Sequence, residues 1–82
     1  MCRNITALRG LEPPATPEEV SAAALQYVRK VAGISSVSAN TQAAVDAAVA
    51  EVAAATNRLL EALPPRRQPP AKEPPLRRLA RR

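Results

Sequence analysis

The reactive side chain of this sequence is its single cysteine, Cys2, which is followed directly by Arg3 and Asn4. Cysteine is small enough as a second residue for Met1 to be removed, and we expect this removal to leave a free α-amino group beside the thiol. Such an amine can act as the base of its own thiol, and the positive charge of Arg3 favours the thiolate. Three interpretations of Cys2 stay open: a redox or intersubunit metal-binding site, a catalytic nucleophile, or a small residue packed beneath an N-terminal arm.

A second group of chemically active residues lies in the tail, residues 64–82, which reads PPRRQPPAKEPPLRRLARR. The tail has a net charge of +6, and because the whole chain has +5, residues 1–63 sum to −1. A cationic chain binds nucleic acid without sequence preference by releasing counterions from phosphates. Alternatively, the tail contacts anionic lipid or an acidic protein. It could also be a solvated segment that only keeps the protein soluble. The predicted anion-binding residues are Arg66, Arg67, Lys72, Arg77, Arg78, Arg81 and Arg82.

The composition argues against most enzyme classes. There is no histidine, which removes the commonest general base and metal ligand. The two glycines, Gly10 and Gly33, are too few for a phosphate-binding loop, and one cysteine cannot form an internal disulfide. We therefore predict no catalytic residue and no cofactor, and a small non-catalytic interaction or regulatory protein is the favoured class.

The strongest structural signal is the start of a helix over residues 17–32. Thr16 is a good N-cap, Pro17 suits the first helical position, and Glu19 completes a capping box. Gly33 is placed to end the helix in the left-handed conformation. Apolar residues cover more than half of this helix, so we expect it to contact two neighbours, one of which is the N-terminal arm.

A second helix is predicted over about residues 39–63, with Ser38 or Asn40 as its N-cap and Pro64 as its stop. Its larger residues repeat with a spacing of four and three, which is a heptad seam. The short connection predicts that the two helices form an antiparallel hairpin. Alanines dominate the rest of this helix, and their uncharged face allows a second copy to approach closely.

The sequence thus predicts an all-α fold with three parts: an arm (1–15), a helical hairpin (16–63) and a disordered basic tail (64–82). The arm is expected to contain a short helix over residues 4–9, stopped by Gly10. Because the hairpin has no Phe or Trp, its core is thin, and we expect a homodimer or an unknown protein partner. No stretch suits a signal peptide or a membrane span, which predicts a cytoplasmic protein.

The body also resembles a known family over residues 1–63. It opens Met-Cys-Arg-Asn-Ile, continues with Glu-Pro-Pro-Ala-Thr and Ala-Ala-Leu-Gln-Tyr-Val-Arg-Lys-Val, and closes with Ala-Ala-Ala-Thr and Arg-Leu-Leu. These motifs are similar to those of a family of short bacterial proteins classed as a domain of unknown function. The resemblance implies no reaction, ligand or partner, but it includes Cys2, Arg3 and Asn4 in the family pattern and so favours a role for the arm.

Overall fold

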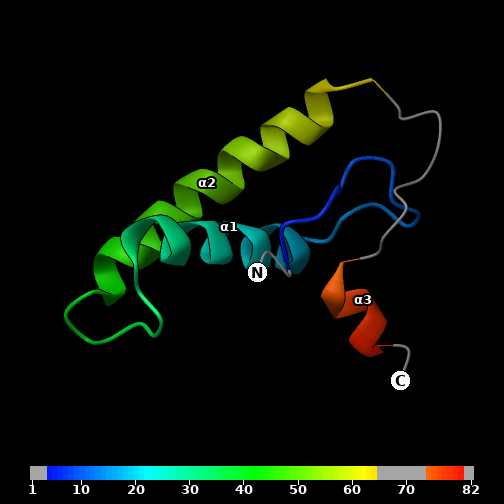
Figure 1. Cartoon of the computed structure of the whole chain (residues 1–82). Coiled ribbons are helices and arrows are strands. Elements are labelled where there is room, and N and C mark those ends of the chain that lie inside the picture. The colour runs from blue at the N-terminus through cyan, green and yellow to red at the C-terminus, as the bar shows by residue number, and fades with distance from the viewer. Residues whose placement is uncertain (1–3, 65–73, 81–82) are drawn as a thin grey trace.

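The structure, a computed structural model, describes residues 4–64 and 74–80, and the side chains of residues 78–80 are not described. This part of the chain contains three helices, α1 (Pro17–Ala32), α2 (Gln42–Ala62) and α3 (Pro75–Ala80), and no strand. Helices α1 and α2 pack against each other as a hairpin, and α3 lies beside the N-terminal end of α1 (Figure 1). The predicted all-α hairpin is confirmed. None of the described helices is long and apolar enough to cross a bilayer.

Helix α1 has the ends that its sequence predicts. Thr16 Oγ1 accepts a hydrogen bond from the backbone N–H of Glu19 at 3.1 Å, and Glu19 Oε1 accepts one from the backbone N–H of Thr16 at 2.8 Å. At the other end, Gly33 has a φ of 70°. The N–H groups of Gly33 and Ile34 donate to the carbonyl oxygens of Lys30 and Arg29, which is a Schellman motif. Both ends of α1 are therefore fixed by local hydrogen bonds.

Helix α2 begins at Gln42, three residues later than predicted, and neither Ser38 nor Asn40 is its N-cap. Thr41 holds the cap position but makes no side-chain cap bond. Its Oγ1 instead accepts from the N–H of Ser38 at 3.0 Å and donates to the carbonyl oxygen of Ser38 at 3.2 Å. The hydroxyl is used to close a turn before the helix, so it is not available to the first turn of α2.

The predicted short helix over residues 4–9 is wrong, because the arm has no helical segment between residues 4 and 16. Asn4, Ile5 and Thr6 have low helix propensity, and a segment of six residues is too short to compensate the cost of nucleating a helix. Gly10, with a φ of 87°, lies in a turn and does not end a helix. The arm is an extended strap whose shape is set by what it contacts.

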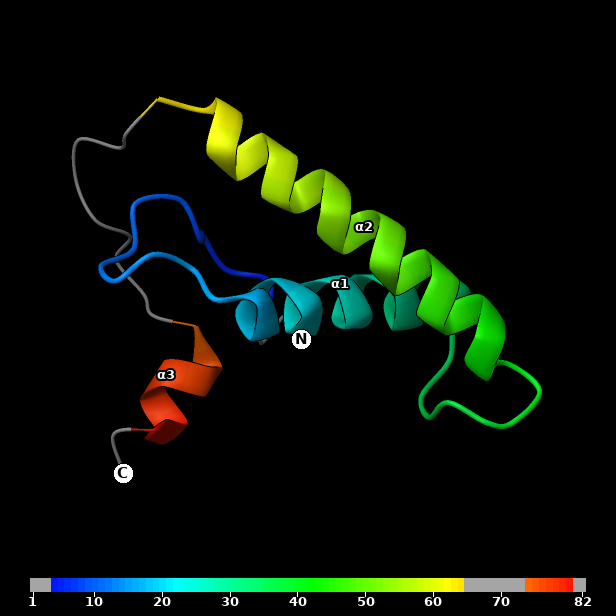
Figure 2. The same ribbon diagram turned by 180° about the vertical axis from the view of Figure 1, so that it is seen from behind.

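The hydrophobic core lies where the arm fits between α1 and α2. Leu8, Leu11 and Val20 are buried together, and Ala53 and Leu60 of α2 pack against them. Figures 1 and 2 show that α2 diverges from α1 toward its C-terminal end, with the arm beside the opening. The arm therefore completes the core of the hairpin.

Hydrogen bonds fix the arm to both helices. The backbone N–H of Asn4 donates to Oε1 of Gln26 on α1. Further along the arm, Arg9 donates from Nε and Nη2 to the carbonyl oxygen of Pro64, at 3.0 and 2.8 Å. The arm thus joins the middle of α1 to Pro64, two residues after the end of α2.

The prediction of disorder over residues 64–82 is wrong for residues 75–80, which form α3. Pro75 is pre-organised for the first position of a helix, and Pro74 before it is buried. Arg77 holds the segment to the body by an ion pair with Glu19. The remainder of that prediction, at residues 65–73 and 81–82, lies outside the described residues.

Candidate functional site

Among the sites that side chains from different elements form on the described surface, three differ clearly in their chemistry. We call them the interhelical groove, the Asn4 pocket and the Glu19 site. The first two are hollows, whereas the third is already filled by a side chain of the same protein.

The interhelical groove runs between the arm, α1 and α2 and has a volume of about 260 Å³. None of the described side chains that line it is charged; they are Ile5, Thr6, Leu8, Ala23, Ala24, Tyr27, Val52, Thr56 and Leu60. Tyr27 and Ile5 are exposed on its rim, at 49% and 42%. A groove of this composition can bind apolar side chains but offers no group for acid, base or nucleophilic chemistry.

Two polar atoms in the groove behave differently. Thr56 Oγ1 donates to the carbonyl oxygen of Val52 at 2.7 Å, so its hydroxyl is satisfied within α2. Thr6 Oγ1 is buried and has no hydrogen-bond partner among the described residues. A buried hydroxyl without a partner costs about 1–3 kcal/mol, and this cost is removed when an incoming group bonds to it.

An apolar edge continues from the groove along both helices. On α1, Val31 lies one turn after Tyr27 and is 67% exposed. On α2, Leu59 lies one turn after Thr56 and is 54% exposed, and Leu63 follows it. Residues three and four apart share one face of a helix, so these side chains extend the apolar surface of the groove.

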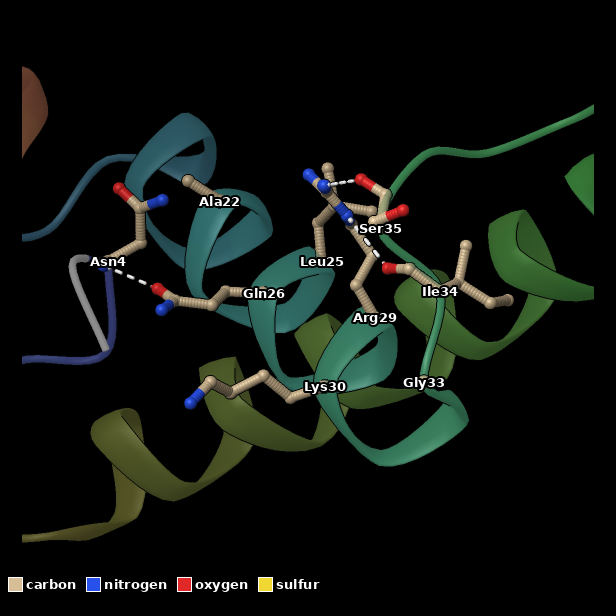
Figure 3. Close-up of a pocket in the computed structure, with 9 residues that line it drawn as sticks. All are labelled: Asn4, Ala22, Leu25, Gln26, Arg29, Lys30, Gly33, Ile34 and Ser35. Atoms are coloured by element: carbon tan, nitrogen blue, oxygen red, sulfur yellow. Dashed lines mark hydrogen bonds between the residues drawn. The ribbon is translucent and has the colours of Figure 1, made fainter. Parts of the chain in front are cut away.

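The Asn4 pocket lies on the side of α1 that faces away from α2 and has a volume of about 550 Å³. Figure 3 shows Asn4 at one end, the Ile34–Ser35 segment at the other, and Ala22 and Leu25 of α1 between them. Arg29 donates from its guanidinium to the carbonyl oxygens of Ile34 and Ser35, and it thereby stabilises the chain after α1.

The charges around the Asn4 pocket have one sign. Arg29 and Lys30 line it, and no acidic residue does. The guanidinium of Arg29 is engaged with two carbonyl oxygens, and the amide of Gln26 accepts from the backbone of Asn4. The polar groups of this pocket therefore hold the arm and the loop in place, and they do not converge on a common point as the groups of a catalytic site do.

The Glu19 site joins α3 to the start of α1. Arg77 donates from Nε to Glu19 Oε2 at 2.7 Å and from Nη2 to Glu19 Oε1 at 3.2 Å. The same Nη2 also donates to the carbonyl oxygens of Pro13 and Pro14. The side chains of Arg77 and Glu19 are 15% and 3% exposed, so this ion pair is largely removed from water.

The protonation of Glu19 follows from these contacts. Burial alone would raise the pKa of Glu19, but the hydrogen bonds from Arg77 and Thr16 and the charge of Arg77 outweigh burial and lower the pKa below its ordinary value. The carboxylate is therefore ionised at neutral pH and available as an acceptor for a guanidinium.

The residues predicted from sequence are only partly described by the structure. Asn4 lines the pocket named after it, whereas Cys2 and Arg3 lie outside the described residues. In the tail, Arg77 is paired with Glu19, and the side chains of Arg66, Arg67, Lys72, Arg78, Arg81 and Arg82 are outside the description. Within the described residues, no three Cys, His, Asp or Glu side chains are close enough to hold a metal ion.

Sequence reasoning missed three residues of these sites. Glu19 was predicted only as a helix cap, although an acidic residue that becomes buried needs a cationic partner. Tyr27 belongs to the apolar arc of the first predicted helix and Leu59 to the heptad seam of the second, but their exposure depends on how far α2 diverges from α1. No local pattern reports that divergence.

The fold and the sites together define a class of small all-α protein, a helical hairpin completed by an N-terminal strap. The family model described as "Uncharacterized conserved protein (DUF2277)" matches residues 1–82, and the chain belongs to this family. The match includes residues 64–82, which the sequence resemblance had left outside. No curated protein and no solved structure gave a match.

Proposed function

We propose that the protein is a small, non-catalytic interaction protein that pairs with a second copy of itself through the interhelical groove and its apolar edge. The observation that carries this proposal is the state of α2. It has 21 residues and a heptad seam, yet Val45 is its only buried residue in the described structure. The last part of the seam, at Leu59 and Leu63, therefore remains available to another molecule.

The composition of the surface supports a second copy as the occupant. The groove has no charged side chain in its lining, and residues 1–63 have a net charge of only −1, so repulsion between two bodies is weak. Leu59 and Leu63 of one copy are apolar side chains of the kind that the groove of the other can accommodate. A partner can also supply a hydrogen bond to the buried Thr6 Oγ1.

The test is the oligomeric state of full-length protein carrying a charge on one face of α2. We expect the wild type to sediment as a dimer of the 8.7 kDa chain. The variant Leu59→Lys should be monomeric at the same concentration, because a lysine ammonium cannot be buried unpaired in an apolar interface. The matched control is Ala54→Lys, which places the same charge on an exposed position of the alanine face.

The two variants also separate the two faces of α2. Dissociation by Leu59→Lys with an intact Ala54→Lys dimer supports pairing through the groove. The opposite pattern would place the contact on the alanine face and contradict the proposal. A wild-type protein that sediments as a monomer at every concentration would contradict pairing altogether.

Two alternative functions rest on residues outside the described part of the chain. A redox or metal-binding role of Cys2 is tested by mass spectrometry of native protein, which detects removal of Met1, oxidation and bound metal. A reduced, metal-free thiol of ordinary reactivity would argue against it.

Non-specific nucleic-acid binding by the tail is tested by deleting residues 64–82. Duplex DNA retention on a gel should then be lost, and unchanged retention would exclude this role.

A further inference from the structure

We infer that the Glu19 site is an exchangeable arginine-binding site: α3 fills it within the chain through Arg77, and the same segment of a second copy can replace it. This inference uses a surface that the proposed function does not use. It concerns the start of α1, whereas the proposed pairing concerns the groove between α1 and α2.

The receptor half of the site is built without any contribution from α3. Its acceptors are the Glu19 carboxylate and the carbonyl oxygens of Pro13 and Pro14. The carboxylate is held by the capping box with Thr16, and the core residues Leu11 and Val20 lie on either side of this stretch. Because the capping box holds the carboxylate without α3, this part of the site remains formed when its occupant leaves.

The occupant is a short helix that follows the buried Pro74 and bonds to the body through Arg77. Every hydrogen bond that the structure shows between α3 and the body is donated by Arg77. Helix α3 has six residues, which is too short for a helix to be stable in isolation. The segment is therefore ordered by its binding, in the manner of a peptide ligand.

The geometry selects arginine over lysine. One edge of the guanidinium, Nε and Nη2, bonds both oxygens of Glu19, and Nη2 also bonds the two prolyl carbonyl oxygens. A planar group with several fixed donors can serve acceptors on two sides at once, whereas an ammonium ion is a compact point charge. The preferred ligand is therefore a peptide in which arginine follows Pro-Pro-Leu, as it does at residues 74–77.

The experiment measures binding of a labelled peptide of residues 74–82 to the full-length Arg77→Ala variant, whose site is vacant, by fluorescence anisotropy. We expect saturable binding. Binding to the wild-type chain should be at least about tenfold weaker, because the tethered Arg77 competes at an effective concentration on the order of millimolar. Adding Glu19→Gln to Arg77→Ala should also weaken binding at least about tenfold. Glutamine at this position can still complete the capping box, so the start of α1 is retained.

Two peptides of equal charge separate site recognition from general attraction between a basic peptide and the body. A peptide with Arg77→Lys should bind at least about tenfold more weakly than one with Arg78→Lys. Equal affinities of the two peptides would overturn the inference, as would absence of saturable binding to an Arg77→Ala chain whose circular dichroism is that of the wild type. If that variant does not fold, the wild type is titrated instead. Peptide-dependent shifts of the Thr16 and Glu19 amide resonances then support the inference, and unchanged resonances contradict it.

Discussion

Helices α1 and α2 are neighbours in one hairpin, but they are stabilised in different ways. α1 has a side-chain cap at its start, a Schellman motif at its end and four buried residues among 16. α2 has no side-chain cap and one buried residue among 21. The arm and α2 cover α1 from two directions, whereas much of α2 faces solvent. α1 is therefore held by packing and local hydrogen bonds, and α2 by the high helix propensity of its alanines.

This difference assigns the two helices different roles. A helix whose position is fixed at both ends can support the arm, the Glu19 site and the Asn4 pocket. A helix that is stable mainly through its own backbone can leave its side chains exposed for another molecule. The exposed end of the α2 seam, Leu59 and Leu63, is then the expected property of an interaction surface, and the buried arc of α1 is the property of a scaffold.

The largest expected loss of stability comes from shortening a buried valine of α1, and the same substitution in α2 is the comparison. Val20→Ala should lower the free energy of unfolding by about 2 kcal/mol, because Val20 is 1% exposed and its loss leaves a cavity. Val49→Ala should cost about 1 kcal/mol or less, because Val49 is half-buried. Urea denaturation at one fixed protein concentration measures both. Equal losses would show that α2 is packed as tightly as α1.

The next largest loss of stability is expected from replacing Gly33, which ends α1 in the left-handed conformation. Gly33→Ala should cost about 1–2 kcal/mol, because alanine is strained at a φ of 70°. No atom lies within 4 Å of the added Cβ, so the loss would report backbone strain without a clash. Gly33→Asn is the matched control and should lose less, since asparagine tolerates this conformation. A similar loss for both variants would argue against this cause.

A smaller loss of stability is expected from removing the threonine hydroxyl at the start of each helix. Thr16→Ala should lower stability by about 1 kcal/mol, because it removes the hydroxyl that accepts from Glu19. Thr41→Ala should cost clearly less, because the Thr41 hydroxyl bonds only to Ser38 in an exposed turn. Thermal unfolding of both variants makes the comparison. A larger loss for Thr41 would show that α2 depends on its start more than its hydrogen bonds indicate.

The smallest expected effect is a pH dependence of stability that arises from Glu19 of α1. The pKa of Glu19 is lower in the folded protein than its ordinary value of 4.5, so its contribution to stability is complete above that value. The contribution is lost as the pH falls from about 4.5 through the folded pKa. Glu19→Gln removes this titration, and its unfolding free energy should therefore fall less steeply in acid than that of the wild type. Parallel curves for the two proteins would contradict the assignment.

The ends of α1 were predictable from sequence because their signals are local. Thr16 and Glu19 are three residues apart, and Gly33 directly follows the last helical residue. The first residue of α2 was not predictable from sequence, because Ser38, Asn40 and Thr41 are all acceptable N-caps. The turn geometry that decides among them is set by hydrogen bonds between their own side chains and backbone.

The sites were harder to predict because their parts are distant in sequence. Arg77 and Glu19 are 58 positions apart, and the tail offers seven basic residues with no local reason to prefer one of them. The arm likewise has helical spacing of Ile5, Leu8 and Leu11, but its shape follows from the space between two diverging helices. Tertiary contact overrides local pattern in both places.

The hydrogen bonds from Arg9 to Pro64 have a consequence for how the molecule opens. They connect the turn of the arm to the end of α2, the two segments that complete the core around Leu8 and Leu60. Neither segment can leave without breaking the contact that holds the other. Amide protons at the end of α2 should therefore exchange with solvent together with those of the arm, as one subglobal unit, while the middle of α1 stays protected until the whole domain unfolds.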